Sequence, residues 1–363
     1  MRITAALARA AGQPLVLEQC ELDAPRADEV LVRIEACGIC HTDLVARDQQ
    51  WPVPLPAVLG HEGVGIVQAL GAGVEEFAVG DRVLMSFGAC GHCPSCDNGR
   101  PGYCYQAPVF QVMAQREDGS SPIRCRGERV SGHFFRQSSF ASHAITSTVN
   151  LVKLEADLSP SLMAPLACGV LTGAGAVLTS LQAEAGRAIA VLGCGAVGQS
   201  AIMAAKIAGC DPIVAVDVNA ERLALAQALG ASQLIEPSQQ PLKKTLKQLG
   251  GMHYVIDTTG NPEVIAEGFA GLRAQGTLLC VGVSPPGSQL PVDMASLLMQ
   301  GKTLRGCIEG DAVPAELVPR LIEFYRQGQL PLEKLVTVYA FADINRAIED
   351  AKGGRVVKAV LSM

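Results

Sequence analysis

The sequence lacks three features that mark whole classes of protein: clusters of positive charge, long hydrophobic runs and a leader-like N-terminus. Its 29 Lys and Arg residues are outnumbered by 35 Asp and Glu residues and are spread thinly, so we do not expect nucleic acid as a partner. Every long apolar run is broken within about 18 residues, so we predict no transmembrane helix. The first residues, Met1 to Thr4, enter a mixed segment without a basic region and apolar stretch. We therefore expect a soluble, cytoplasmic protein.

Aromatic residues are also scarce, at 4% of the chain with a single Trp. Hydrophobic residues make up 49% of the 363 positions and charged residues 18%, which is enough apolar material for substantial cores. This length and composition exclude a disordered or fibrous chain and predict two domains.

Cysteine is plentiful, and its distribution gives the strongest local signal. Thirteen cysteines are an odd number in a long chain, which favours a reducing compartment over a secreted disulfide framework. Four of them form the pattern C-x2-C-x2-C-x7-C, namely Cys90, Cys93, Cys96 and Cys104. Four thiolates satisfy tetrahedral zinc and leave no site for water, so we expect a structural zinc that replaces a missing local core. A redox pair, an iron–sulfur cluster and reduced thiols are the alternatives.

The hydrophobic pattern changes along the chain. Residues 1–150 hold short alternating runs that predict a β-rich domain, as in 29–35, 63–70 and 81–85. From about residue 160, helix-length segments near 196–209, 220–229, 241–249 and 262–273 alternate with apolar strands at 188–192, 212–216, 254–257 and 276–281. This alternation is typical of a doubly wound parallel sheet. The last sixty residues predict helices at 314–327 and 343–352 and a strand at 355–361.

A glycine motif follows the first strand of the second region. Gly193, Gly195 and Gly198 form G-x-G-x-x-G between a strand and a helix, where glycines permit a tight turn and close approach of a pyrophosphate to the helix N-terminus. The next strand ends at Asp217, where a carboxylate is expected to meet the ribose hydroxyls and favour NAD over NADP. Arg222, five residues further on, weakens this preference for NAD, although it could equally contact a ribose hydroxyl. A glycine turn that serves only packing is the alternative.

Two segments of the β-rich half carry possible metal ligands. They are Cys40-His41-Thr42-Asp43 and Gly60-His61-Glu62-Gly63. Cys, His and Glu are ligand types, yet each segment alone is equally compatible with a small buried Cys, a capped His or a glycine-rich bend.

Taken together, these segments, the four-Cys lobe, Pro165-Leu-Ala-Cys168-Gly and the glycine motif resemble the zinc-containing medium-chain alcohol dehydrogenases over nearly the whole chain. Within that family the chain is most similar to bacterial aryl-alcohol (benzyl alcohol) dehydrogenases, with geraniol-type enzymes nearby. The resemblance implies an α/β protein: a GroES-like β-rich catalytic domain at 1–169 and 308–363 with both zinc sites, and a Rossmann NAD-binding domain at 170–307.

The resemblance also transfers roles residue by residue. The catalytic zinc ligands match Cys40, His61 and Cys168, with Glu62 a nearby carboxylate and Asp43 the acid that orients the ligand His. Predicted cofactor contacts are His41, Thr172, Val197, Val281, Val283 and Lys358, in addition to the glycine motif, Asp217 and Arg222. Core packing is the alternative for Thr172 and the three valines, and a solvated side chain for Lys358.

The implied reaction is hydride transfer from an alcohol to NAD, with zinc as Lewis acid and Thr42 accepting the hydroxyl proton. In better-known members a His five residues after the first ligand completes the proton relay, but here that residue is Val45, so the proton leaves through the ribose or His41. Trp51 and Phe87 are candidate aromatic walls of the substrate pocket; Trp51 is equally compatible with plugging its loop.

We therefore predict an oxidoreductase with two zinc ions per chain that acts with NAD on primary aromatic or allylic alcohols. The alternatives are a terpenoid (geraniol or perillyl) alcohol dehydrogenase, a glutathione-linked formaldehyde dehydrogenase, a polyol dehydrogenase, or a zinc- and NAD-binding relative that has lost catalysis. The family includes dimers and tetramers, so we expect a homodimer or homotetramer.

Overall fold

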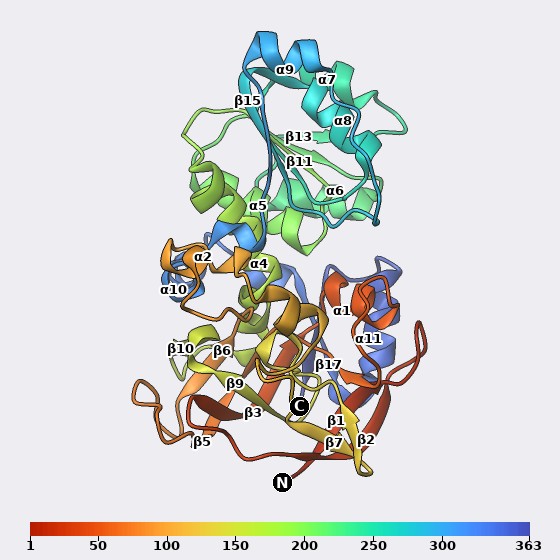
Figure 1. The fold of residues 1–363 in the computed structure, drawn as a ribbon. Helices are drawn as coiled ribbons and strands as arrows, with labels where there is room; N and C mark the ends of the chain where they lie inside the picture. The colour runs from red at the N-terminus through yellow and green to blue at the C-terminus, as the bar shows by residue number, and fades with distance from the viewer. The chain divides into compact units, whose positions relative to one another are not determined.

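The computed structural model describes residues 1–363, which divide into two compact units (Figure 1). Unit 1 comprises 1–168, 313–321 and 332–363, and unit 2 comprises 169–312 and 322–331. The domain limits implied by the resemblance follow the same broad division, but they differ in 308–312 and 322–331, which belong to unit 2. Those limits stay a prediction.

Unit 1 is built on two largely antiparallel sheets. The first has the order β4-β1-β2-β7-β8 and consists of β1 (Arg2–Ala8), β2 (Val16–Leu22), β4 (Ala57–Val58), β7 (Ile123–Cys125) and β8 (Glu128–Val130). The second has the order β10-β6-β5-β3-β18-β17, with β9 also paired to β3. Its strands are β3 (Glu29–Gly38), β5 (Gly63–Leu70), β6 (Arg82–Met85), β9 (His143–Ser147), β10 (Leu151–Leu154), β17 (Val336–Ala340) and β18 (Lys358–Ser362). The predicted β-rich half is confirmed.

Short helices connect these strands. They are α1 (His41–Arg47), α2 (Pro94–Asp97), α3 (Pro160–Met163) and α11 (Ile344–Lys352), while α10 (Pro314–Arg326) runs from unit 1 into unit 2. The predicted helices at 314–327 and 343–352 are thus present. The strand predicted at 355–361 begins three residues later, at Lys358, because 353–354 form a turn after α11.

Unit 2 is a six-stranded parallel sheet in the order β13-β12-β11-β14-β15-β16. The strands are β11 (Ile189–Leu192), β12 (Ile213–Val216), β13 (Gln233–Ile235), β14 (Met252–Asp257), β15 (Leu272–Cys280) and β16 (Thr303–Gly306). The helices are α4 (Gly169–Gly175), α5 (Ala196–Ile207), α6 (Ala220–Leu229), α7 (Leu242–Gln248), α8 (Pro262–Ala270) and α9 (Met294–Gln300). This strand order is that of a Rossmann fold, which places a dinucleotide where the order reverses, at β11 and β14.

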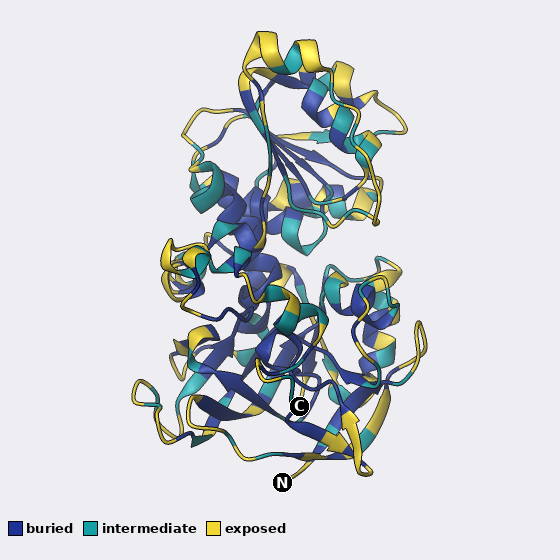
Figure 2. Ribbon diagram, in the orientation of Figure 1, coloured by how far each residue is buried: buried dark blue, intermediate teal, exposed yellow.

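The central strands of the unit 2 sheet are buried on both faces, as a parallel sheet with crossover helices requires. All four residues of β11 and of β12 are buried, and Figure 2 shows the strands dark blue while the outer helices carry exposed residues. The predicted fold class is confirmed. No single helix is long and apolar enough to cross a membrane; one bent pair, Pro160–Ala167 with Gly169–Leu181, passes by length and composition across a 56° break.

Candidate active site

Three separate parts of unit 1 bring the predicted catalytic ligands together. Cys40 lies between β3 and α1, His61 and Glu62 lie between β4 and β5, and Cys168 follows a short 3-10 helix at Ala164–Ala167. The ligand atoms of Cys40, His61, Glu62 and Cys168 all lie within 4.8 Å of one another. The structure therefore gathers residues that are up to 128 positions apart, counting from Cys40 to Cys168, into one potential metal site.

Asp43 orients two of these ligands from the first turn of α1. Its Oδ2 accepts the backbone N–H of Cys40 at 2.9 Å, and its Oδ1 lies 2.9 Å from His61 Nδ1 and accepts the N–H of Gly60 at 3.0 Å. Burial lowers the pKa of His61, but the neighbouring Asp43 and Cys40 charges outweigh it and raise that pKa well above its usual value. Asp43 thus fixes the imidazole and the start of the helix that carries Cys40.

The donor set suits zinc. His61 is fully buried, and its Nε2 has no hydrogen-bond partner within the protein. The side chain of Cys168 is the main cause, followed by His61, of a Cys40 pKa well below that of a free thiol, despite the opposing effect of burial. Two thiols and an imidazole are the ligands of an open zinc site, which keeps a fourth position for water or substrate. A metal at this position would give the buried Nε2 a partner, and its binding requires deprotonated ligands.

Lys358 lies against Glu62 inside unit 1. Its Nζ is 2.6 Å from Glu62 Oε1 and donates to Ile39 O at 3.1 Å, and both charged side chains are buried. Burial raises the pKa of Glu62 to about 7, although the Lys358 charge opposes this shift. A Cβ at Gly38 would lie 1.8 Å from Glu62 Oε2, so glycine is needed there for the carboxylate to fit. The alternative of a solvated Lys358 is wrong, and its predicted contact with a pyrophosphate stays a prediction.

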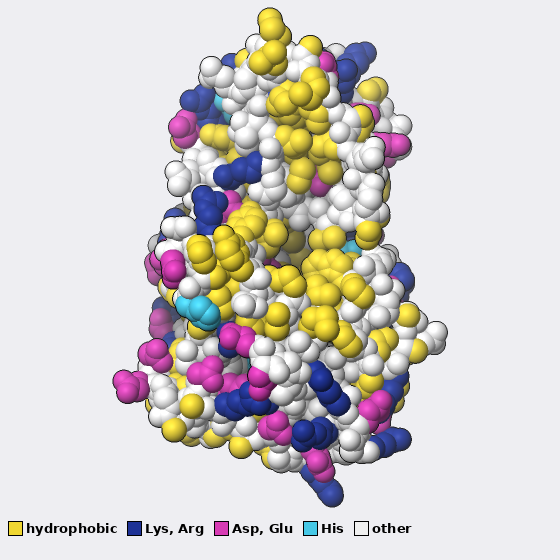
Figure 3. Space-filling view, viewed as in Figure 1, with side chains coloured by type: hydrophobic (Ala, Val, Ile, Leu, Met, Phe, Trp, Pro, Cys, Tyr) yellow, Lys and Arg dark blue, Asp and Glu magenta, His cyan; other side chains and the backbone are white.

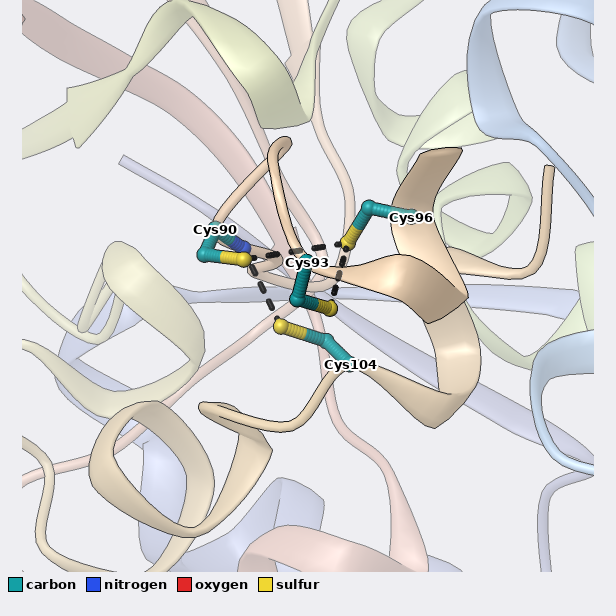
Figure 4. A group of neighbouring side chains, drawn as sticks. All are labelled: Cys90, Cys93, Cys96 and Cys104. Carbon is teal, nitrogen blue, oxygen red and sulfur yellow. Dashed lines mark hydrogen bonds between the residues drawn. The ribbon is translucent and has the colours of Figure 1, made fainter. Parts of the chain in front are cut away.

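The four-Cys lobe forms a second group of converging thiols (Figure 4). Cys96 Sγ lies 3.9 Å from Cys90 Sγ and 3.6 Å from Cys93 Sγ, and Cys104 Sγ accepts the Cys90 N–H at 3.2 Å. The backbone N–H of Tyr105 is the main cause of a Cys93 pKa lowered to about 6. Gly91 and Gly99 have left-handed backbone conformations, with φ of +81° and +69°, at the turns between the cysteines. The four thiols fit a closed tetrahedral zinc site.

The glycine motif of unit 2 has the shape that a dinucleotide requires. Gly193 has φ +90°, and a Cβ at Gly198 would lie 1.9 Å from the Gly193 carbonyl oxygen, so the strand and α5 approach closely only with glycine there. A Cβ at Gly195 would meet nothing within 4 Å. The open space beside Gly195, at the N-terminus of the twelve-residue α5, fits a phosphate group.

Asp217 lies at the end of β12, beside this motif. Its Oδ2 accepts the Cys194 N–H at 2.6 Å and its Oδ1 accepts the Asn219 N–H at 2.8 Å, so the carboxylate is held at the glycine turn. The backbone N–H of Arg222 donates to Asn219 Oδ1 at the start of α6. Asp217 is thus fixed by two backbone groups in the position where the Rossmann fold places its ribose-binding acid.

The remaining predicted residues lie within one unit or the other. In unit 1, Thr42 Oγ1 is 3.7 Å from Cys40 Sγ, His41 is exposed, Trp51 is half-buried and Phe87 is buried. In unit 2, Thr172 Oγ1 donates to Glu309 Oε2 at 3.1 Å, Val197 and Val281 are half-buried, and Val283 is exposed. Their contacts with substrate or cofactor stay predictions.

Sequence reasoning missed the residues that surround His61. Phe135 stacks on its imidazole, with ring centroids 4.5 Å apart and an interplanar angle of 27°, and Phe134 meets it edge-on at 5.8 Å. Gln137 Nε2 donates to His61 O at 3.0 Å. A pair of adjacent phenylalanines is a common core feature, so the sequence carried no signal for this role.

Comparison with known proteins places these sites in a family. Residues 26–156 match the model for the alcohol dehydrogenase GroES-like domain, and residues 196–327 match that for the zinc-binding dehydrogenase domain. The chain is 43% identical over 361 residues to a geraniol dehydrogenase of Castellaniella defragrans, covering 98% of this chain and 96% of the relative. It is 32% identical over 367 residues to an alcohol dehydrogenase class-3 of Myxine glutinosa, covering 99% of this chain and 97% of the relative.

Solved structures agree. A crystal structure of benzyl alcohol dehydrogenase from Acinetobacter calcoaceticus is 39% identical, with a TM-score of 0.97 over 100% of this chain and 99% of that one. An alcohol dehydrogenase zinc-binding domain protein from Burkholderia ambifaria is 44% identical, with a TM-score of 0.98 over 100% of this chain and 99% of that one. With two potential metal sites, a dinucleotide motif on a Rossmann sheet and these relatives along its full length, the chain belongs to the zinc-containing medium-chain alcohol dehydrogenase family, whose members use zinc and NAD(P).

Proposed function

We propose that this protein is an NAD-dependent zinc alcohol dehydrogenase that converts primary aromatic or allylic alcohols into aldehydes. The observation that carries the proposal is the convergence of Cys40, His61 and Cys168 on one point, with a buried His61 Nε2 that lacks a partner. Cys90, Cys93, Cys96 and Cys104 would hold a second, structural zinc. Zinc, when bound at the first site, supplies a Lewis acid for the alcohol oxygen, and NAD supplies the hydride acceptor.

Thr42 is the proton acceptor in this proposal. It follows Cys40 by two residues, and its Oγ1 lies 3.7 Å from Cys40 Sγ, so a hydroxyl beside Cys40 would be within its reach. Further along the same helix, Val45 is buried and apolar and cannot carry a proton. His41 is exposed and adjacent to Thr42, so it would pass a proton from Thr42 to water, and the ribose of a bound NAD would offer the other route.

The choice of NAD follows from Asp217. Its carboxylate is held at the glycine turn by the Cys194 and Asn219 N–H groups, and a 2′-phosphate there would meet its negative charge. We expect the wild type to prefer NAD, and Asp217→Ala to shift the preference towards NADP. A wild type that prefers NADP would remove Asp217 from this role.

The substrate class is supported by the activities for which two relatives are named, a geraniol dehydrogenase at 43% identity and a benzyl alcohol dehydrogenase at 39% identity. Geraniol is allylic and benzyl alcohol is aromatic, and both are primary alcohols with a π-system next to the reacting carbon. Trp51, half-buried after α1, would form one flat wall for such a group. The second candidate, a terpenoid alcohol dehydrogenase, is favoured by the 43% identity to the geraniol enzyme.

A substrate panel tests the proposal. NADH formation is followed with benzyl alcohol, geraniol, sorbitol and a glutathione–formaldehyde adduct, each with NAD and with NADP. We expect the first two substrates to be turned over with NAD, and Cys40→Ala to abolish turnover. Activity confined to sorbitol or the adduct would overturn the substrate class, and no turnover with any of them would favour a binding protein.

We also propose a homo-oligomer that forms through the edge of the unit 2 sheet. The strand β16 is hydrogen-bonded only to β15, and the neighbouring helix α9 exposes 80% of Leu298 and 82% of Met299. Figure 3 shows hydrophobic side chains gathered over this end of unit 2. A free strand edge and an apolar helix face suit association with a second copy. Sedimentation should give a dimer or tetramer, and Leu298→Glu should weaken it.

The state of the cysteines bears on the compartment in which the protein works. None of the thirteen cysteines is joined in a disulfide, which favours a reducing, cytoplasmic location for the protein in this proposal.

A further inference from the structure

A short segment of unit 1, Phe134–Ser139, packs against the buried side chain of His61. We call this segment the strap. Phe135 stacks on the face of the imidazole and Phe134 meets it edge-on, while Phe134 and Phe135 contact each other at 4.7 Å. Together with Asp43 at Nδ1, these contacts restrict the orientation of the ring. The strap therefore contributes, with Asp43, to the direction of Nε2.

Gln137 fixes the strap to the backbone that carries His61. Its Oε1 accepts the N–H of Gly63 at 3.1 Å and the hydroxyl of Ser139 at 2.8 Å. Its Nε2 lies 3.0 Å from His61 O, 3.1 Å from Met85 O and 2.8 Å from Ser86 O, and donates to these carbonyls. Gln137 is fully buried, so one amide joins the His61 turn, the end of β6 and the strap.

The backbone of the strap is unusual. Phe135, Arg136 and Ser138 have φ values of +53°, +58° and +54°, in the left-handed region that residues other than glycine rarely adopt. A non-glycine residue in this region persists only where surrounding contacts hold it. Here the Ser138 hydroxyl provides two of them, because it accepts the Phe134 N–H at 2.8 Å and donates to Val58 O at 2.6 Å.

Arg136 extends the strap to the four-Cys lobe. Its side chain is buried, its Nη1 donates to Ala89 O at 2.7 Å, and its guanidinium carbon lies 4.6 Å from the centre of the Phe110 ring. Ala89 directly precedes Cys90, and Ala89 and Phe110 pack in one apolar cluster with three of the four cysteines. The four-Cys lobe thus contacts Arg136, which is the neighbour of both Phe135 and Gln137 in the chain.

We propose that the strap is a positioning element for the metal ligand His61, and that Arg136 makes its conformation depend on an intact four-Cys lobe. This inference rests on the proposed role of His61 as a zinc ligand. The structural zinc would then affect the catalytic ligand set through Arg136 and Phe135, in addition to maintaining its own loop. Residues that orient a metal ligand commonly change metal affinity by about 10-fold or more when they are replaced.

Phe135→Leu tests the contact with His61. We expect the variant to keep two zinc ions per chain when freshly purified, to lose one of them to a chelator about 10-fold faster than the wild type, and to shift the visible spectrum of the cobalt-substituted catalytic site. Phe269→Leu in unit 2 is the matched control, because Phe269 is 2% exposed and Phe135 is 3% exposed. Release rates and cobalt spectra of Phe135→Leu that equal those of the wild type would overturn the proposal.

Arg136→Met tests the link to the lobe, and it serves even if Phe135→Leu fails to fold. We expect the same change in the cobalt spectrum of the catalytic site. Arg126→Met is its control, since Arg126 also has a left-handed backbone, at φ +52°, but its side chain is 80% exposed. An unchanged catalytic spectrum in Arg136→Met would refute the link. His61→Ala tests the assignment of His61 as a ligand separately from the positioning role of the strap. If this variant retains both zinc ions, His61 is not a zinc ligand, whatever the strap variants show.

Discussion

Asp43→Asn removes one acceptor from a carboxylate that needs both of its oxygens. Asp43 Oδ2 accepts the Cys40 N–H, while Oδ1 serves both the Gly60 N–H and His61 Nδ1. An asparagine has a single acceptor oxygen, so whichever way its amide turns, an NH2 group faces at least one N–H donor. The orientation that keeps Gly60 and His61 loses Cys40, and the opposite orientation loses the other two contacts.

The smaller loss is one hydrogen bond to a charged acceptor, which contributes about 1.5–3 kcal/mol to stability when buried. At about 2–4 °C per kcal/mol for a domain of this size, unit 1 should melt several degrees lower. Because Asp43 also orients two ligands, zinc affinity at the catalytic site should fall by about 10- to 100-fold. Both quantities are measurable, by calorimetry and by competition with a chromogenic chelator.

Asp48→Asn is the control, because Asp48 directly follows the same helix α1 but its carboxylate pairs with Arg47, at a distance of 2.7 Å, and not with a ligand residue. We expect it to leave zinc affinity unchanged. If Asp43→Asn binds zinc as tightly as Asp48→Asn does, the reasoning that Asp43 positions Cys40 and His61 is refuted.

Three further outcomes are expected. Gly198→Ala places a methyl group 1.9 Å from the Gly193 carbonyl oxygen, so NAD binding measured by calorimetry should fall at least tenfold. Gly306→Ala is the control and should bind NAD normally, because its Cβ would meet nothing within 4 Å. Burial, aided by the charges of Arg136 and Arg116, lowers the pKa of His133 to about 3, below its value of about 6.5 in the unfolded chain. The unfolded chain therefore binds a proton below pH 6.5 that the folded chain does not, and the free energy of unfolding falls by about 1.4 kcal/mol per pH unit below that pH. His133→Gln should flatten that slope in urea titrations between pH 6.5 and 4.5, and an identical slope would contradict the assignment. Cys104→Ser should reduce the zinc content from two ions to one and lower the melting temperature; a retained second zinc would show that Cys104 is not a ligand.

The features predicted from the sequence are those encoded within a few neighbouring residues. The four-Cys lobe spans only Cys90 to Cys104, so its spacing indicates it, and the glycine motif is indicated by its place between a predicted strand and a predicted helix. Cys168 has no such local context, and only the resemblance to a family identified it. The strands β13 and β16 lie at the two edges of the sheet and include polar, exposed residues, so they lack the apolar run that marks β11 and β12, and they were not predicted.

Lys358 shows why long-range electrostatics escape such reasoning. A lysine close to the end of a chain is ordinarily solvated, but β18 pairs with β3 and brings Lys358 beside Glu62, 296 residues away in sequence. The same holds for Phe135, whose contact with His61 depends on a left-handed backbone that nothing in Phe-Phe-Arg indicates. In both cases the partner is determined by topology, which local sequence does not specify.

The environment of His61 restricts the orientation of this side chain. Asp43 occupies Nδ1, Phe135 covers a face and Phe134 meets an edge, so the only direction left open to the ring is that of Nε2. Because Nδ1 lies against Asp43, Nε2 is the nitrogen left for a metal, within 4.8 Å of the sulfurs of Cys40 and Cys168, and metal binding there would displace the proton that the raised His61 pKa retains. Because little side-chain freedom remains to be lost, metal binding at this site costs less conformational entropy than it would with a mobile histidine.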